Sequence, residues 1–534
     1  MLAAACAPRS PAPLTSVSAT VPPVNTAAMD AHLKYLADDL LEGRAPATRG
    51  GELAARYIAA QFEAAGLAPA GPEGSYYQPV TLIGMTPRPN FVWGTGTATN
   101  ALRYLEDFVA WAGRPDPHIV ADGDVIFVGF GVRAPEWQWD DYKETDVRGK
   151  VLLMLVNDPG LQDTSVFKGR GLTYYGRWTY KLEEAARRGA LGVVLIHTTR
   201  SATYPWEVVR GSWSVEQFTL DGPATPQLAF ASWVTSAAAT RALRAVGWSL
   251  DSLTRAAARR DFTPVVTRLH VAVTINSPMR RVRSANVVAK LEGSDPALAE
   301  QAVLITAHYD HKGIGPATMG DSIYNGAEDN ASGVAAMLAA AQALAQVTPR
   351  PRRSVLFIAT TAEESGLLGS EAYVRAPIFP LDRTAAVVNI DGANVRGLTH
   401  DVGALGADRS ELGDVFATAA RAESLTATGD PDPSKGSFFR SDHFPFARAG
   451  VPSLSIESGV DFRGRPAGWG DEQARLFNDQ RYHQPSDEYK STFNYEGMAQ
   501  QVRVLMRIVL AVANTTESPR WLRTSEFQRT GARP

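Results

Sequence analysis

Cysteine is nearly absent from this chain, since Cys6 is the only one among its 534 residues. That count excludes a disulfide framework and a cysteine-based zinc site. Long apolar runs are missing as well. The most apolar helical stretch covers residues 331–345, contains Ser332 and Gln342, and is shorter than the roughly 18 apolar residues that span a bilayer.

A large excess of charge of either sign is also absent. Lys and Arg number 53 against 56 Asp and Glu, which gives a formal net charge of -3. No global basic field exists to attract nucleic acid, so we expect no nucleic-acid partner. Hydrophobic residues make up 45% and charged residues 20%, a balance typical of globular proteins. At roughly 150 residues per domain, the length predicts two to four domains.

The chain begins with small and apolar residues that lead directly to its single cysteine. Residues 2–6 are similar to the end of a bacterial lipoprotein signal, although a basic n-region and a longer apolar core are missing. Residues 7–27 are rich in Pro, Ser, Thr and Ala, which suits a tether. We therefore expect an exported bacterial protein: periplasmic, secreted, or tethered to the cell envelope as a lipoprotein through a lipidated Cys6. The alternative is a disordered tail with an incidental cysteine.

Three regions of different composition follow this tail. Apolar residues at spacings of three and four predict helices across residues 29–67. The region 91–283 contains buried strands, such as 124–132 and 150–158, but no paired-carboxylate motif. The predicted domains are a signal remnant and tether at 1–27, the N-terminal part of the main domain at 28–94, an inserted domain at 95–283, the main domain at 284–515 and a C-terminal tail at 516–534.

The main domain alternates predicted strands with helices. Strands are predicted at 284–293, 301–310, 353–364, 385–394 and 451–459, with a helix at 331–347. This order is typical of an α/β fold, in which a mostly parallel, mixed central sheet is sandwiched by helices. Ligands bind such sheets at the carboxyl ends of the strands.

Acids and histidines cluster at those strand ends or in nearby loops. They are His308, Asp310, Asp329, Glu363, Glu364, Asp391 and His483. Imidazole with carboxylate suits zinc, and additional carboxylates suit two divalent ions that share a bridging acid. Each feature alone is common on protein surfaces, whereas all of them at one sheet edge predict a metal site.

Five segments resemble, in order, the five motif blocks of the co-catalytic di-zinc aminopeptidase family. They are AHYDH (307–311), NGAEDNASG (325–333), ATTAEESGLLGS (359–370), NIDGAN (389–394) and YHQPSDEY (482–489). The family includes bacterial leucyl-type aminopeptidases, and its relatives include glutamate carboxypeptidase and the non-catalytic transferrin receptor. LEGR (41–44) and GSYYQPV (74–80) are similar to the family's opening segment. The insert resembles the β-rich protease-associated domain that often occurs there.

The resemblance implies two Zn²⁺ per chain and a ligand for each position. His308 and Asp391 would bind one ion, Glu364 and His483 the other, and Asp329 would bridge them. Glu328 stands where many members have an aspartate that is not a ligand, so we expect this difference to be harmless.

The resemblance also implies three further roles. Glu363 would be the general base, Asp310 would orient His308 by accepting its ring N–H, and Tyr482 would hydrogen-bond the oxyanion. Side chains alternate along an extended strand end, so we expect Glu363 and Glu364 to point in different directions. Packing is the alternative role for Tyr482.

The most favoured function is an aminopeptidase that releases N-terminal residues from peptides. A carboxypeptidase of the glutamate carboxypeptidase type stays open, since Arg396, Arg440 and Arg448 lie near the motifs and could hold a substrate carboxylate. A non-catalytic receptor-like relative and a one-zinc cyclase are less favoured, because all five ligand positions and Glu363 are present. The many acids in the motifs suit a free α-amine, which is cationic below a pKa of about 8.

Overall fold

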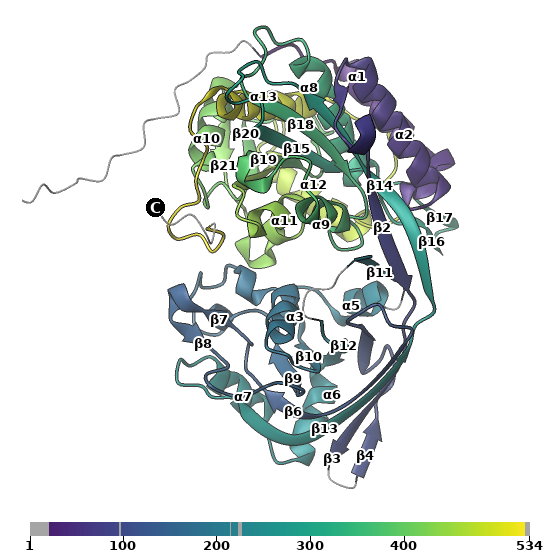
Figure 1. Cartoon of the computed structure of the whole chain (residues 1–534), viewed down its shortest axis with the longest axis vertical. Coiled ribbons are helices and arrows are strands. Elements are labelled where there is room, and N and C mark those ends of the chain that lie inside the picture. Colours follow the sequence, from purple (N-terminus) through teal and green to yellow (C-terminus); the bar gives the residue numbers. More distant parts are fainter. Residues whose placement is uncertain (1–20, 96–97, 214, 223–226, 529–534) are drawn as a thin grey trace, which may run out of the picture. The chain divides into compact units, whose positions relative to one another are not determined.

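The computed structural model describes residues 21–95, 98–213, 215–222 and 227–528, and the chain divides into two compact units (Figure 1). Unit 1 comprises residues 1–80, 284–430 and 440–534, and unit 2 comprises 81–283 and 431–439. The chain leaves unit 1 within strand β2 (Tyr77–Met85) and returns within β14 (Met279–Leu291). The predicted tether up to residue 20 and Cys6 lie outside the described residues.

Unit 1 is built on a mixed sheet in which four neighbouring strands run in the order β18, β15, β19, β22. Their bounds are Ser354–Thr360, Ala302–His308, Thr384–Ile390 and Ser453–Glu457. All three neighbouring pairs among them are parallel. Antiparallel strands flank this set: β14 pairs with β18, and β20 (Asp401–Leu405) pairs with β22. Strand β21 (Thr426–Thr428) completes that side of the sheet, parallel to β20.

Alternate residues of these strands supply two apolar cores, one on each face of the sheet. Ile305 and Phe357 belong to the larger core, which also contains apolar side chains of α10 (Leu412–Ala422) and of four further helices. These are α1 (Thr26–Leu36), α2 (Arg49–Ala64), α8 (Ser332–Leu344) and α13 (Glu496–Asn514). Leu304 and Leu356 point to the other core, with Tyr373 of α9 (Leu368–Arg375) and Phe446 of α11 (His443–Arg448). Successive side chains of a strand point to opposite faces of the sheet, so both faces bury apolar residues and both are covered by helices.

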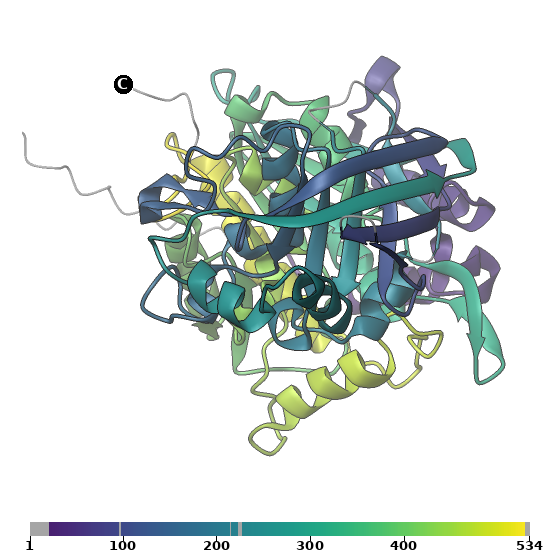
Figure 2. The ribbon, with the colours of Figure 1, turned by 90° about the horizontal axis from the view of Figure 1, so that it is seen from below.

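Unit 2 has its own eight-stranded mixed sheet, in the order β4, β3, β13, β6, β9, β10, β12, β5. Their bounds are Ala98–Ala101, Arg88–Thr95, Val265–Asn276, His118–Phe127, Val151–Leu155, Gly192–His197, Phe230–Thr235 and Phe108–Ala112. Strand β13 pairs with β3 and β6, and its long teal ribbon is visible from below in Figure 2. Helices α6 (Ser236–Ala245) and α7 (Leu250–Ala257) contribute to one core, and α3 (Trp178–Arg187) and α5 (Trp206–Trp213) to the other.

The predicted α/β class is confirmed, and the predicted strands and helix of the main domain are present. The helices predicted across 29–67 are α1 and α2, separated by a 3-10 segment at Asp39–Arg44. One local expectation is wrong. The strand before Glu363 and Glu364 ends at Thr360, so these two residues lie in a turn and not on an extended strand end.

Candidate metal centre

The first half of the centre is formed where two parallel strands end side by side. His308 is the last residue of β15, and Asp391 directly follows β19, the parallel neighbour of β15. The Nε2 atom of His308 lies 3.1 Å from an oxygen of Asp391 and 3.3 Å from Oδ1 of Asp329. The His308 side chain is only 1% exposed. Three of the predicted ligands therefore converge on one point.

The second half of the centre involves the other oxygen of Asp329. The Nε2 atom of His483 lies 3.3 Å from Oδ2 of Asp329 and 3.1 Å from Oε2 of Glu364. The two carboxylate oxygens of Asp329 thus face two different histidines. This is the arrangement that a bridging carboxylate needs.

The donor set fits a pair of divalent ions. Nitrogen and oxygen ligands that lie about 2.0–2.2 Å from a tetrahedral zinc are about 3.3–3.6 Å from one another. The four histidine–carboxylate distances given above, 3.1–3.3 Å, are close to that spacing. The buried carboxylates of the centre also stabilise positive charge beside them. Burial opposes protonation of His483, but Glu364 and Asp329 outweigh it and raise the pKa of His483 to about 9.

Glu363 and Glu364 separate into the two halves of the centre. Carboxylate oxygens of Glu363 and Asp391 and a nitrogen of His308 lie within 4.8 Å of one another, and so do donor atoms of Glu364, Asp329 and His311. The turn after β18 causes this separation, since Ala362 has a φ of +54°. Burial raises the pKa of Glu363 well above its ordinary value. A raised pKa makes the carboxylate a stronger base, which suits general acid–base work.

The Asp310 carboxylate binds the turn that carries Glu363 and Glu364, and it does not hydrogen-bond the ring of His308. Its two oxygens accept the backbone N–H groups of Glu363 and Glu364, at 3.1 and 3.4 Å. The Nδ1 atom of His308 lies 3.1 Å from the backbone carbonyl oxygen of Asp310 but 3.9 Å from its carboxylate. The structure therefore differs from the predicted contact, because the Asp310 carboxylate faces the two amides. Burial raises the pKa of Asp310 to about 7.

Tyr482 directly precedes His483, and its hydroxyl makes no hydrogen bond among the described contacts, whereas its backbone N–H donates to the carbonyl of Phe477. Its ring stacks on that of His483, with the centroids 3.8 Å apart. The residue is 45% exposed. The role in oxyanion binding stays a prediction.

Sequence reasoning missed two residues that contact Glu364. The Nδ1 atom of His311 lies 2.7 Å from Oε1 of Glu364, and Nζ of Lys312 lies 2.8 Å from Oε2. Burial opposes ionisation of Glu364, but His483, Lys312 and His311 hold its pKa well below the ordinary value. Both residues directly follow His308–Asp310 in the chain. Their side-chain types, an imidazole and an ammonium, were the sequence signal that could have identified them.

Arg44 is a further residue whose importance only the structure reveals. Its guanidinium is buried and donates to the backbone carbonyls of Tyr309, Asn325 and Gly326, and to that of Leu36. Tyr309 lies between His308 and Asp310, and Gly326 leads into the turn that carries Asp329. Burial lowers the pKa of Arg44 to about 10, against the effect of the nearby acids.

Two further contacts fix the loop of Asp329. The carboxylate of Asp487 accepts the backbone N–H groups of Glu328 and Asp329, each at 3.0–3.1 Å. The Glu328 side chain lies 2.5 Å from Arg396 and 2.6 Å from Arg481. Glu328 therefore points to two arginines and takes no part in the cluster of predicted ligands.

Comparisons with known proteins give one family match. The model of peptidase family M28 matches residues 286–509. Among curated proteins, a vacuolar membrane protease from Candida dubliniensis is 32% identical over 114 residues, which are 21% of this chain and 11% of that protein. The chain thus spans about a tenth of the length of the curated relatives that it matches.

Solved structures with a similar fold include two bacterial proteins. An aminopeptidase from Aneurinibacillus sp. strain AM-1 gives a TM-score of 0.49 at 18% identity, over 93% of this chain and 95% of that one. A zinc aminopeptidase from Bacillus subtilis gives a TM-score of 0.43 at 18% identity, over 93% of this chain and 97% of that one.

The predicted localisation is corrected by these comparisons. We expected an exported bacterial protein, either secreted or tethered through Cys6. The curated relatives are instead vacuolar membrane proteases of yeasts, so this expectation is wrong. Its physical basis was a short stretch around Cys6, which lies outside the described residues. Within the part of the chain that the structure describes, no helix has the length and apolarity needed to cross a membrane.

Proposed function

We propose that this chain, whose residues 286–509 match the model of peptidase family M28, is a di-zinc aminopeptidase. It would release N-terminal residues from peptides. The observation that carries the proposal is the position of Asp329, whose two oxygens lie 3.3 Å from His308 and 3.3 Å from His483. His308 and Asp391 would hold one ion, and His483 and Glu364 the other.

The two ions would supply Lewis-acid chemistry, polarising the scissile carbonyl and lowering the pKa of a water. Glu363 would accept a proton from the attacking water and pass it to the leaving amine. Its carboxylate lies with His308 and Asp391, whereas Glu364 lies with Asp329. Asp310 would keep both glutamates in place through their backbone amides. Tyr482 would donate its hydroxyl to the developing oxyanion.

The charges around the centre favour attack from the N-terminus. A carboxypeptidase needs an available cation for the terminal carboxylate. Arg396 pairs with Glu328, and Arg448 pairs with Glu371, so both guanidiniums already have a carboxylate partner. The buried acids Glu363 and Asp442 instead suit a cationic α-amine.

The inserted domain belongs to this proposal as well. We regard the predicted insert at 95–283 as a protease-associated domain without a catalytic residue. In support, both candidate metal groups among the described residues consist of residues of unit 1. The histidines of unit 2 have partners within that unit: His118 contacts Asn276, His197 contacts the carbonyl of Tyr204, and His270 contacts Asp122 and Asp124.

A substrate panel tests the direction of attack. Zinc-loaded enzyme should cleave free-amine dipeptides and amino-acid anilides, and should leave the N-acetylated forms of the same substrates intact. Efficient cleavage of an N-acetylated dipeptide with a free C-terminus would reassign the enzyme as a carboxypeptidase. Glu363→Gln is the matched control, because activity that stays at the wild-type level in this variant comes from a contaminating peptidase.

A further inference from the structure

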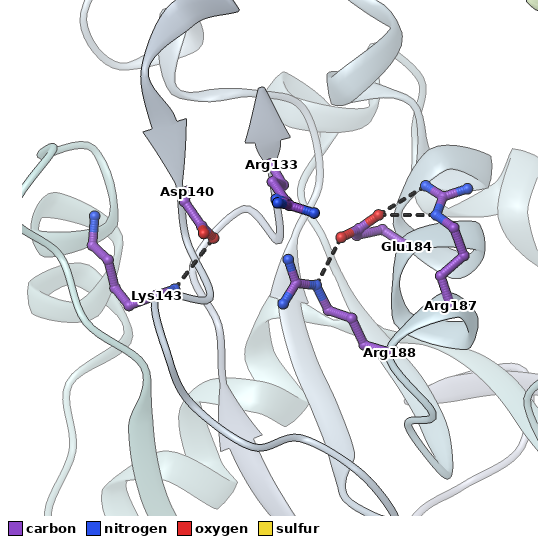
Figure 3. A pocket seen from close by; sticks show the side chains of 6 residues that line it. All are labelled: Arg133, Asp140, Lys143, Glu184, Arg187 and Arg188. Carbon is purple, nitrogen blue, oxygen red and sulfur yellow. Dashed lines mark hydrogen bonds and ion pairs between the residues drawn. The ribbon is translucent and has the colours of Figure 1, made fainter. Parts of the chain in front are cut away.

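Unit 2 contains a cavity of about 350 Å³ whose walls are charged (Figure 3). Its lining residues are Arg133, Asp140, Lys143, Glu184, Arg187 and Arg188. Four of them are basic and two are acidic, so the lining has a formal excess of two positive charges. None of them belongs to the candidate metal centre.

One of the two acids is already neutralised. Glu184 of α3 accepts Nε of Arg188 at 2.7 Å, and Nε and Nη2 of Arg187 at 3.0 and 2.8 Å. The dashed lines in Figure 3 mark these contacts. The Glu184 side chain is 9% exposed, so these hydrogen bonds are sheltered from solvent. Glu184 acts as an anchor that fixes Arg188.

Arg188 is held ready for a ligand. Its guanidinium lies 3.9 Å from the ring centroid of Tyr142, and its side chain is 21% exposed. Within the described residues, Nε is the only guanidinium nitrogen of Arg188 that donates a hydrogen bond, and it donates to Glu184. The N–H groups of the two terminal nitrogens therefore remain available as donors. Figure 3 shows one of these nitrogens directed toward Arg133. A guanidinium that is oriented in advance loses little rotamer entropy on binding.

The guanidinium of Arg133 supplies a second set of hydrogen-bond donors, in addition to that of Arg188. It lies on β7 (Arg133–Ala134), opposite Asp140 of β8 (Trp139–Asp140). Its guanidinium has no ion pair with any residue that the structure describes. Asp140 accepts the backbone N–H groups of Tyr142 and Lys143. The ammonium of Lys143 is occupied by the carbonyl of Arg260 at 2.8 Å and points away from the cavity in Figure 3.

We propose that this cavity binds a small ligand through one oxyanion group, a carboxylate or a phosphate, held between Arg133 and Arg188. The planar donor fork of arginine matches the oxygens of both groups. The cavity volume is at the lower end of the range of small-molecule sites, about 300–1,000 Å³. Asp140 on the wall repels additional negative charge, so the site selects ligands with a single anionic group. The proposal is independent of the peptidase activity, because the cavity lies outside unit 1.

Calorimetric titration of the zinc-loaded full-length chain tests this site. The probes are inorganic phosphate and N-acetyl-leucine, with the cation tetramethylammonium as the negative probe. We expect saturable binding of at least one anion, which identifies the oxyanion, and at least tenfold weaker binding in Arg133→Gln and Arg188→Gln. The Arg133 side chain makes no ion pair among the described residues, so Arg133→Gln should fold even if Arg188→Gln does not.

Arg259→Gln is the matched control. Arg259 is an exposed arginine of unit 2 that pairs with Asp261, and its replacement removes one positive charge without altering the cavity. Equal weakening in Arg259→Gln would mean that the anion responds to net charge alone. That result, unchanged affinity in Arg133→Gln, or no saturable binding of either anion would overturn the proposal.

Discussion

Asp329 is the residue on which the two halves of the candidate centre depend. Its Oδ1 and Oδ2 face His308 and His483 respectively. Its backbone amide is bound by Asp487, and the preceding chain is bound by Arg44. A short loop between β17 (Asp321–Tyr324) and α8 therefore determines where both ions would lie.

Glu363 and Glu364 should respond differently to the same substitution. Glu363→Gln removes the proposed base and should keep both metals while losing about 10²–10⁴-fold in kcat. Glu364→Gln replaces a proposed ligand and should instead weaken one of the two metal sites. Elemental analysis and steady-state kinetics of both variants measure these effects. Loss of metal in Glu363→Gln with full metal content in Glu364→Gln would reverse the assignment.

Arg44→Lys should weaken metal binding at least tenfold while the protein stays folded. An ammonium keeps the charge but cannot donate to carbonyls of Tyr309, Asn325 and Gly326 in the planar geometry of a guanidinium. Competition with a chromophoric chelator measures the affinity.

Arg353→Lys is the control for this experiment. Arg353 is equally buried, at 1% exposure. It also donates to backbone carbonyls, but to those of Val512, Thr515 and Thr516 at the C-terminal end of α13. Its replacement should lower stability without changing metal affinity. Equal effects of the two variants on metal affinity would contradict a positioning role for Arg44.

The sequence was sufficient for the candidate ligands but not for the residues that hold them. His308, Asp391 and the acids after β18 follow apolar strands, so their common edge could be predicted from strand order. Arg44 is 265 residues from Tyr309 and binds only backbone carbonyls, which leave no pattern in side-chain types. The Asp310 contact was missed for a related reason, since its partners are backbone amides of a turn.

At the scale of secondary structure, helices α1, α2 and α8 meet around one buried histidine. The Nδ1 atom of His32 lies 2.9 Å from the hydroxyl of Tyr57 on α2, and Nε2 lies 3.5 Å from Gln342 on α8. Burial lowers the pKa of His32 from 6.5 to about 4. The contact between these helices therefore depends on a neutral imidazole.

Acid should weaken this packing. Protonation is easier in the unfolded chain, so the stability from neutral His32 is complete above pH 6.5 and is lost as the pH falls toward 4. At pH 5 the loss is about 2 kcal/mol relative to pH 7. Thermal unfolding of wild type and His32→Gln should show a smaller pH dependence in the variant. The same pH dependence in both proteins would contradict this role, and exposed His118→Gln provides the matched control.

Element types followed from periodicity, whereas element ends did not. The nearly continuous apolar runs of β15 and β18 predict strands that are buried on both faces. The end of β18 at Thr360 was missed, because Ala362 adopts a left-handed φ that nothing in its side chain favours. The difference matters chemically, since this turn sends Glu363 and Glu364 to different halves of the centre.

At the scale of the whole molecule, the metal centre draws only on unit 1. Among the described residues, its proposed ligands come from segments between His308 and His483, all within that unit. Replacement of residues 82–282 by a short Gly/Ser linker should therefore leave a chain that still binds two ions per molecule. Metal analysis of the folded deletion variant measures this, with circular dichroism to verify folding. A folded variant that binds no metal would contradict the claim that unit 1 alone forms the metal centre.

Metal content is the most direct test of the central claim, that the strand ends of unit 1 form a two-metal peptidase site. Elemental analysis of the purified, dialysed full-length chain should find two divalent ions per chain. Chelation should abolish peptidase activity, and added zinc should restore both the metal content and the activity. The contradictory result is a folded chain that holds at most trace metal and stays inactive after zinc is added.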